Sequence, residues 1–289
     1  MANDGSIVWQ VSVDTNGAKA DIEDITKTIK NETGKWDDAA KKSSGDMESS
    51  FSGALKKIAA GFSAVQIGKA LLDIAHGYRK TFDIPFIGLT GSVGKTTSKG
   101  MIYSVVKKGF DTHRTAGNLN NEIGVPKTLF CLEEHHEAAV IEMGMNHFGE
   151  ISYLTSIAKP DLAVITNIGT VHVEYLGSVE GILQAKLEIL EGMAQDGRII
   201  LNGDDNLLWN QKKTGGMNAK YFGVRNPECA LLGESIREQD GELRFTVRSG
   251  NDTFPVELAL EGQHYVHDAL AAVVVGMEMN VPTVKIQES

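Results

Sequence analysis

The chain has 289 residues, of which 42% are hydrophobic, which is enough for one large or two modest globular domains. Its formal net charge of −10 argues against a nucleic-acid partner, because nucleic acids are bound through basic patches that release phosphate counterions. Cys131 and Cys229 are the only cysteines, which are too few for a disulfide framework. The sequence shows neither a signal peptide nor an apolar run of about 18 residues. We therefore expect a cytoplasmic protein without a membrane span.

The first 75 residues differ in character from the rest of the chain. Residues 6–13 include a short β-like run, and a turn follows at 14–17. Residues 31–52 are rich in Lys, Asp, Ser and Gly and predict disorder or a solvated helix. Residues 54–75 carry apolar side chains at helical spacing, which predicts a helix whose broad apolar face serves packing or self-association. In its order and composition this segment resembles the N-terminal part of phage tail tape-measure proteins.

From residue 76 to residue 289, apolar strands alternate with helical segments, the pattern of a doubly wound, mostly parallel α/β sheet. The strands are expected at 86–90, 138–142, 162–166 and 198–201, and the helices near 96–108, 148–158, 179–192 and 205–212. Two β-like runs at 242–247 and 253–258 and an alanine-rich helix at 264–279 follow. Ligands bind at the carboxyl ends of the strands in such sheets, so the polar residues that follow these strands, Asn167 among them, are the candidates for a functional site.

A phosphate-binding loop is predicted directly after the first of these strands, where the sequence reads Thr-Gly-Ser-Val-Gly-Lys-Thr-Thr. Gly91 and Gly94 permit the tight turn that aims backbone N–H groups at a phosphate, and a helix begins there. Lys95 adds a positive charge for the outer phosphates, and the Thr96 hydroxyl suits a magnesium ion. The strand and helix on either side disfavour the alternative of a glycine-rich turn with a surface lysine. The predicted nucleotide-binding residues are Gly91, Ser92, Val93, Gly94, Lys95, Thr96 and Thr97.

Three further residues have side chains that suit chemistry at this edge of the sheet. Glu142 ends an apolar strand, so its carboxylate suits a magnesium ion beside the phosphates, the alternative being a strand-end glutamate in solvent. His172 follows another strand and has no assignment by itself. Lys186 lies on a helix that is apolar on one side, where spacing alone favours a surface lysine.

An amide-rich loop occupies residues 117–126, with the sequence Gly-Asn-Leu-Asn-Asn-Glu-Ile-Gly-Val-Pro. Its side chains offer donors and acceptors for a polar substrate, but solvation of an ordinary loop explains them equally well. The substrate-binding candidates are Asn118, Asn120 and Asn121. By contrast, His135 and His136 lie in an acidic loop and are interpreted as solvated surface.

Six motifs in chain order resemble the central domain of Mur ligases, most closely the members that add D-alanyl-D-alanine to UDP-N-acetylmuramoyl-tripeptide. They lie within residues 76–280 and read Thr-Gly-Ser-Val-Gly-Lys-Thr-Thr, Gly-Asn-Leu-Asn-Asn-Glu-Ile-Gly-Val-Pro, Ile-Glu-Met-Gly-Met, Thr-Asn-Ile-Gly-Thr-Val-His, Ala-Lys-Leu-Glu-Ile-Leu and Leu-Asn-Gly-Asp-Asp. The resemblance implies that Lys95 and Thr96 bind ATP phosphates and magnesium. It also implies that Glu142 and His172 hold magnesium ions and that Lys186 is carbamylated and helps to place a second ion. Lys95, His172 and Lys186 are thus the predicted catalytic residues.

The chain departs from the family pattern in two respects. Where the family commonly has His-Asn-x-x-Asn, this chain has His264-Tyr-Val-His-Asp268, which puts an adenine or ribose contact in doubt. The family's N-terminal UDP-sugar domain and its closing C-terminal domain are not recognisable in the sequence. We therefore expect the 289-residue chain to bind nucleotide but to ligate slowly, because positioning of the substrates depends on those domains.

The main interpretation is an ATP-dependent amide ligase core of peptidoglycan precursor synthesis, with UDP-N-acetylmuramoyl-tripeptide and D-alanyl-D-alanine as substrates and ATP and magnesium as cofactors. One alternative is a non-enzymatic chimera, in which a nucleotide-binding fragment is fused to a phage structural segment, and another is a simple P-loop ATPase. ATP hydrolysis without a UDP-muramoyl peptide would support the ATPase, and nucleotide binding without turnover would support the chimera. The sequence leaves open whether the fusion is natural, the third residue of the tripeptide and the oligomeric state.

Overall fold

The computed structural model describes residues 75–289 except 195 and 215–218. The described residues form one compact unit, and residues 75–79 are helical. The expectations for residues 1–74, including most of the helix proposed for self-association, lie outside the described residues, and the domain boundary near residue 75 stays a prediction. Among the helices of the described residues, none combines the length and the apolar character that a membrane span requires.

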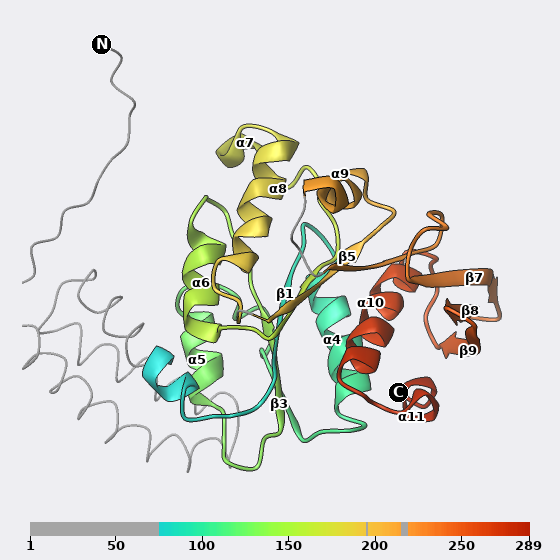
Figure 1. Ribbon diagram of the computed structural model, residues 1–289, viewed down its shortest axis with the longest axis horizontal. Coiled ribbons are helices and arrows are strands. Elements are labelled where there is room, and N and C mark those ends of the chain that lie inside the picture. The colour runs from blue at the N-terminus through green and yellow to red at the C-terminus, as the bar shows by residue number, and fades with distance from the viewer. Residues whose placement is uncertain (1–74, 195, 215–218) are drawn as a thin grey trace, which may run out of the picture. The chain divides into compact units, whose positions relative to one another are not determined.

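Within the described residues, the strands form a nine-stranded sheet (Figure 1). They are β1 (Phe86–Thr90), β2 (Thr112–Arg114), β3 (Ala138–Glu142), β4 (Leu162–Ile165), β5 (Arg198–Asn202), β6 (Ala219–Gly223), β7 (Leu231–Gln239), β8 (Glu242–Ser249) and β9 (Asp252–Leu258). Their order is β2-β3-β1-β4-β5-β6-β7-β8-β9. Neighbours are parallel from β2 to β7, and β7–β8 and β8–β9 are antiparallel. The predicted doubly wound, mostly parallel α/β fold is therefore confirmed.

The helices divide between the two faces of this sheet. They are α4 (Lys95–Val106), α5 (Gly124–Phe130), α6 (Glu150–Ala158), α7 (Val173–Leu176), α8 (Val179–Leu187), α9 (Asn206–Asn210), α10 (Tyr265–Glu278) and α11 (Thr283–Gln287), with short 3-10 turns η1 (Glu188–Leu190) and η2 (Gln211–Thr214). Helices α4 and α10 lie side by side on one face, and α5, α6 and α8 lie on the other (Figure 1).

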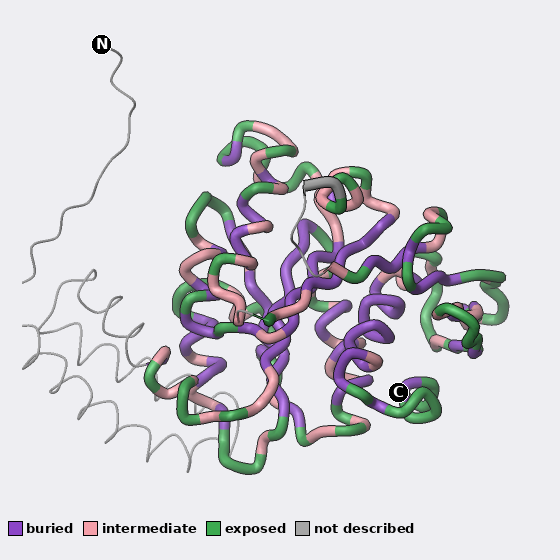
Figure 2. Tube along the Cα trace, viewed as in Figure 1, coloured by how far each residue is buried: buried purple, intermediate pink, exposed green. Residues whose placement is uncertain are grey.

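The central parallel strands are buried because helices cover both of their faces. Every residue of β1, β3 and β4 is buried, and continuous apolar runs are typical of such strands. Figure 2 shows the buried residues concentrated in these strands and in α10. In β1, Ile87 and Leu89 belong to the apolar core that also includes α4 and α10. This packing fixes the positions at which the strands end.

The two edges of the sheet are protected in different ways. The edge strand β2 has only three residues, too few to offer a long template for another chain. The other edge strand, β9, contains Pro255, which has no backbone N–H to donate. Gln287 of α11 donates a hydrogen bond from Nε2 to the Pro255 carbonyl at 3.0 Å, so α11 lies against this strand.

The expected strands at 86–90, 138–142, 162–166 and 198–201 correspond to β1, β3, β4 and β5, with ends that agree within one residue. The expected helix at 179–192 is wrong in its length, because α8 ends at Leu187 and continues only as η1. The expected helix at 205–212 begins one residue later, because Asp205 caps α9: its Oδ1 accepts hydrogen bonds from the backbone N–H groups of Leu207 and Leu208. The sequence pattern does not predict β2, β6, β7, α5, α7 or α11.

Candidate active site

The carboxyl end of β1 is the place where the connections of the sheet change direction. β1 lies between β3 and β4, with Leu89 opposite Glu142 and Thr90 opposite Ile165. The loops that follow these three strands therefore meet at one edge, which is where open α/β sheets bind their ligands. The predicted convergence of the phosphate loop, Glu142 and Asn167 is present.

The loop between β1 and α4 has the backbone that the glycine spacing predicts. Gly94 has φ 78°, in the left-handed region that glycine adopts without steric cost. A Cβ atom on Gly91 would lie 2.0 Å from Thr166 Oγ1, so no larger residue fits there. Helix α4 begins at Lys95, and no side chain in the described part of the chain caps its first turn. The N–H groups of that turn are therefore available to an anion.

Asn167, which follows β4, holds the phosphate loop in shape. Its Oδ1 accepts hydrogen bonds from the N–H groups of Ser92 and Val93, both at 3.0 Å, and its Nδ2 donates to the Val93 carbonyl at 2.9 Å. The N–H of Gly169 donates to Ser92 Oγ at 2.8 Å. Two N–H groups of the loop are thus engaged inside the protein, which leaves the start of α4 as the phosphate-facing part.

Lys95 lies over the loop that precedes it. Its Nζ donates to the Gly91 carbonyl at 2.8 Å and to the Ser92 carbonyl at 3.4 Å. Burial lowers the pKa of Lys95, and the negative charge of Glu142 acts in the opposite direction. Within the described residues, the Lys95 ammonium donates hydrogen bonds to carbonyls of this loop, and phosphate oxygens can engage such a cation.

Glu142 is buried, so the alternative of a solvated strand-end glutamate is wrong. Its side chain is 1% exposed, and its Oε2 forms an ion pair with Lys99 Nζ at 2.8 Å. Its Oε1 accepts a hydrogen bond from Asn120 Nδ2 at 2.8 Å, and its backbone N–H donates to Thr115 Oγ1 at 3.0 Å. The Thr96 hydroxyl donates to Oε2 at 3.4 Å. The sequence did not point to Lys99 or Thr115, because both residues lie outside the six motifs.

The donor atoms around Glu142 fit a magnesium ion. Magnesium binds oxygen ligands, usually one or two carboxylates with water and phosphate oxygens. The Glu142 carboxylate and the exposed Thr96 hydroxyl supply protein oxygens, and both lie beside the first turn of α4. The phosphate loop and this carboxylate therefore form one candidate site for a nucleotide and its metal ion.

Lys186 is the predicted residue whose surroundings differ most from the expectation based on spacing. It is 3% exposed, so the interpretation as a surface lysine is wrong. Burial lowers the pKa of Lys186 to about 7, and the positive charge of Lys95 acts in the same direction. A large fraction of its amine is therefore neutral near pH 7, which is the form that reacts with carbon dioxide.

The other predicted site residues make fewer contacts with the phosphate loop and Glu142. His172 is half-buried at the start of α7 with φ 70°, a conformation that costs energy for a non-glycine residue. Among the amides, only Asn120 contacts Glu142. Asn121 is exposed and accepts hydrogen bonds from the N–H groups at the start of α5, and Asn118 is exposed. His135 is exposed as expected, whereas His136 is half-buried.

A model of the Mur ligase middle domain matches residues 89–276. The chain belongs to the Mur ligase family. The curated UDP-N-acetylmuramoyl-tripeptide--D-alanyl-D-alanine ligase of Bacillus subtilis (strain 168) is 41% identical over 207 residues, which cover 72% of this chain and 44% of that protein. The enzyme of the same name from Escherichia coli (strain K12) is 35% identical over 209 residues, 72% of this chain and 46% of that protein. The chain thus spans about half the length of the curated relatives it matches.

Solved structures of Mur ligases have the same fold. MurF from Acinetobacter baumannii superimposes with a TM-score of 0.72 at 32% identity, covering 77% of this chain and 49% of that one. MurF from Thermotoga maritima in complex with ADP gives a TM-score of 0.72 at 25% identity, covering 79% of this chain and 53% of that one. The family match begins at residue 89, so the tape-measure resemblance of the first 75 residues stays a prediction.

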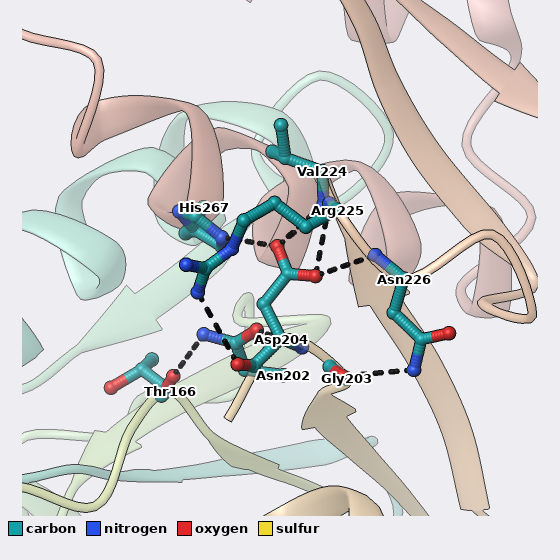
Figure 3. Close-up of polar contacts among 8 residues, drawn as sticks. All are labelled: Thr166, Asn202, Gly203, Asp204, Val224, Arg225, Asn226 and His267. Carbon is teal, nitrogen blue, oxygen red and sulfur yellow. Dashed lines mark hydrogen bonds and ion pairs between the residues drawn. The ribbon is translucent and has the colours of Figure 1, made fainter. Parts of the chain in front are cut away.

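In this Mur ligase domain, the Leu-Asn-Gly-Asp-Asp motif builds a second polar network, shown in Figure 3. The Asp204 carboxylate accepts hydrogen bonds from the N–H groups of residues 224–226 at 2.7–3.0 Å and lies 2.9 Å from His267 Nε2. Burial raises the pKa of Asp204, but these donors outweigh it and hold the pKa below its usual value. Asn202 donates from Nδ2 to the Thr166 carbonyl at 3.0 Å. The motif thus joins β5, the loop after β6, and α10.

The altered family motif on α10 lies behind the phosphate loop of this Mur ligase domain. Asp268 is 8% exposed and shares a hydrogen bond with Ser98 Oγ of α4. A Cβ on Gly94 would lie 3.4 Å from Asp268 Oδ1. Asp268 therefore packs α10 against the start of α4. Burial raises the pKa of Asp268, and the hydrogen bond from Ser98 opposes this shift.

Proposed function

We propose that this chain handles ATP in a cytoplasmic ligase that joins D-alanyl-D-alanine to UDP-N-acetylmuramoyl-tripeptide during peptidoglycan precursor synthesis. The observation that carries the proposal is the buried Glu142 carboxylate beside the Thr96 hydroxyl, at an uncapped helix start that also carries Lys95. The family membership and the names of the relatives support the same substrates.

In this proposal, the nucleotide phosphates bind at residues 91–97. Lys95 would neutralise the outer phosphates, and Thr96 and Glu142 would hold a magnesium ion, which would supply further positive charge beside the phosphates. The side chains of Asn118, Asn120 and Asn121 face the peptide substrate, and Asn120 in addition orients Glu142 through the hydrogen bond at 2.8 Å. This set supplies charge stabilisation and positioning, which are the main contributions of a protein to phosphoryl transfer.

Lys186 and His172 are proposed to hold a second magnesium ion. The lowered pKa of Lys186, about 7, favours carbamylation, because the neutral nitrogen forms a bond to carbon dioxide and then loses a proton. The product is an anionic carbamate, which is an oxygen ligand of the kind that magnesium prefers. Carbamylation would also replace a buried cation beside Lys95 with an anion.

The reaction that fits this site has two group transfers. An oxygen of the tripeptide carboxylate attacks the γ-phosphorus of ATP, the bond to ADP breaks, and an acyl phosphate forms. The amine of D-alanyl-D-alanine then attacks the acyl carbon, phosphate leaves with the bonding electrons, and the nitrogen loses a proton. Lys95 would offset the negative charge on the transferred phosphoryl group.

The proposal is tested by two measurements on the full chain. Calorimetry with ADP and with ATP, each with and without magnesium, should detect magnesium-dependent binding that Lys95→Ala weakens. A ligation assay should then detect slow formation of a product that requires ATP, the UDP-muramoyl tripeptide and D-alanyl-D-alanine together. Hydrolysis of ATP that is indifferent to the UDP-muramoyl tripeptide would instead identify a P-loop ATPase, and binding without any turnover would identify a nucleotide-binding fragment.

A further inference from the structure

Lys99 is a buried charge at this site that the proposed reaction does not use. It lies four residues after Lys95 on α4, so both side chains leave the same side of the helix. Its side chain is 4% exposed, its Nζ is 2.8 Å from Glu142 Oε2, and it donates to the Gly117 carbonyl at 2.5 Å. Lysine and glutamate are almost never buried to this extent unless they are paired.

The ion pair involves the carboxylate that is proposed to bind magnesium. Lys99 Nζ and the Thr96 hydroxyl both contact Oε2 of Glu142, and Asn120 occupies Oε1. A cation of the protein therefore already neutralises this carboxylate. Its second partner, the Gly117 carbonyl, belongs to the amide-rich loop and does not depend on Glu142.

We propose that Lys99 is an internal counter-ion that competes with magnesium for Glu142 and thereby makes metal binding depend on nucleotide. The inference rests on the proposed function of the same site. Without metal, the ammonium pairs with the buried carboxylate and holds it in place, because an unpaired buried charge is strongly destabilising. A divalent cation arriving alone is repelled by this ammonium at close range. The phosphates of a nucleotide supply the negative charge that offsets the repulsion, so metal and nucleotide bind together.

The test compares divalent-ion binding with and without nucleotide. Manganese, which can be counted by electron paramagnetic resonance, replaces magnesium in titrations of the full chain. Lys99→Met should tighten manganese binding in the absence of nucleotide by about tenfold or more, and the difference from wild type should shrink when ADP is saturating. Lys99→Arg retains the charge and should behave like wild type. Lys107→Met removes an exposed lysine that follows α4 and serves as the matched control.

A thermal measurement provides a second readout that does not require activity. Lys99→Met should unfold at a lower temperature than wild type without metal, and magnesium alone should raise its unfolding temperature more than that of wild type. Lys99→Gln, which keeps a donor for Gly117, is the substitute if the methionine variant does not fold.

Three results would overturn the proposal in distinguishable ways. Unchanged manganese affinity in a folded Lys99→Met variant would make Lys99 merely structural. Weaker affinity would make it a residue that orients Glu142 toward the metal. If wild type and variant both fail to bind manganese with ADP, the proposed metal site itself is wrong, and the inference is wrong with it.

Discussion

Two buried carboxylates lie near the same edge of the sheet, and their partners differ in kind. The Glu142 side chain is 1% exposed and is held by side chains, those of Lys99 and Asn120. The Asp204 side chain is 2% exposed and is held mainly by the backbone N–H groups of residues 224–226. Burial alone therefore does not distinguish the two.

The difference lies in whether the partners can be exchanged. A lysine or asparagine side chain can rotate away and release a carboxylate oxygen to an incoming metal ion. Backbone N–H groups in the loop after β6 cannot leave without unfolding that loop. Glu142, which is held by side chains, is therefore the candidate for chemistry, whereas Asp204, which is held mainly by backbone donors, is a structural element.

The largest expected effect is on stability, from Asp204→Asn. The amide presents an N–H₂ group to several backbone donors, so the free energy of unfolding should fall by about 2–4 kcal/mol. Urea denaturation measures this loss, and calorimetry should show nearly normal binding of ADP with magnesium.

The same carboxylate makes stability depend on pH. The pKa of Asp204 is lower in the folded protein than its usual 3.8, so its stabilisation is present above pH 3.8 and is lost as the pH falls through the folded value. The variant should lack that part of the acid sensitivity; loss of nucleotide binding at full stability would contradict the structural role.

Lys95→Ala should weaken nucleotide binding and leave stability nearly unchanged, which is the reverse of the effect expected for Asp204→Asn. It removes the charge nearest the outer phosphates and should weaken magnesium–ATP binding by roughly 1.5–3 kcal/mol, with little change in the free energy of unfolding. Calorimetry measures the affinity, and Lys107→Ala is a control that removes an exposed lysine just after the same helix. Unchanged affinity in the folded variant would mean that the loop is not the nucleotide site.

Lys186 extends the comparison to a group whose charge can be reversed. With a pKa of about 7, its neutral fraction should fall about tenfold between pH 8 and pH 6, and carbamylation should fall with it. Carbon-13 NMR with labelled bicarbonate measures the carbamate signal, and Lys186→Arg should lack it. A signal that persists undiminished in Lys186→Arg belongs to another amine.

Only a small change in stability is expected when both partners of the exchangeable pair, Lys99 and Glu142, are replaced. In the Lys99→Met, Glu142→Gln double variant no buried charge is left unpaired, so the free energy of unfolding should stay within about 1 kcal/mol of wild type. Magnesium should no longer strengthen ADP binding. A large loss of stability, similar to that expected for Asp204→Asn, would show that the Glu142 pair is structural after all.

The central parallel strands are well predicted from the sequence, because strands buried on both faces consist of continuous apolar runs, such as Ala-Ala-Val-Ile in β3. It does not predict β7, in which only the first three residues, Leu231 to Gly233, are buried and the rest lie mainly at the surface. A strand whose side chains face solvent along most of its length carries little periodic pattern.

The site is predictable where a backbone requirement fixes the residue type, as at Gly91 and Gly94. The site is not predictable from the sequence where a polar side chain is buried by segments that lie far from it along the chain. Lys186 reads as a surface lysine from spacing, and only the motif identifies it. Lys99 reads as an ordinary helical lysine, because its partners Glu142 and Gly117 come from segments 18 to 43 residues away.

The edge strand β9 has a consequence for how the protein behaves at high concentration. The edge strand of an open sheet has unpaired backbone N–H and C=O groups, to which a strand of a second molecule can bind. Such pairing can lead to amyloid-like aggregation. Pro255 removes one donor from that edge, and the contact of Gln287 with the Pro255 carbonyl places α11 against it. The short helix α11 thus covers part of this open edge, and we expect its removal to leave the Pro255 carbonyl free to accept a hydrogen bond from a second molecule.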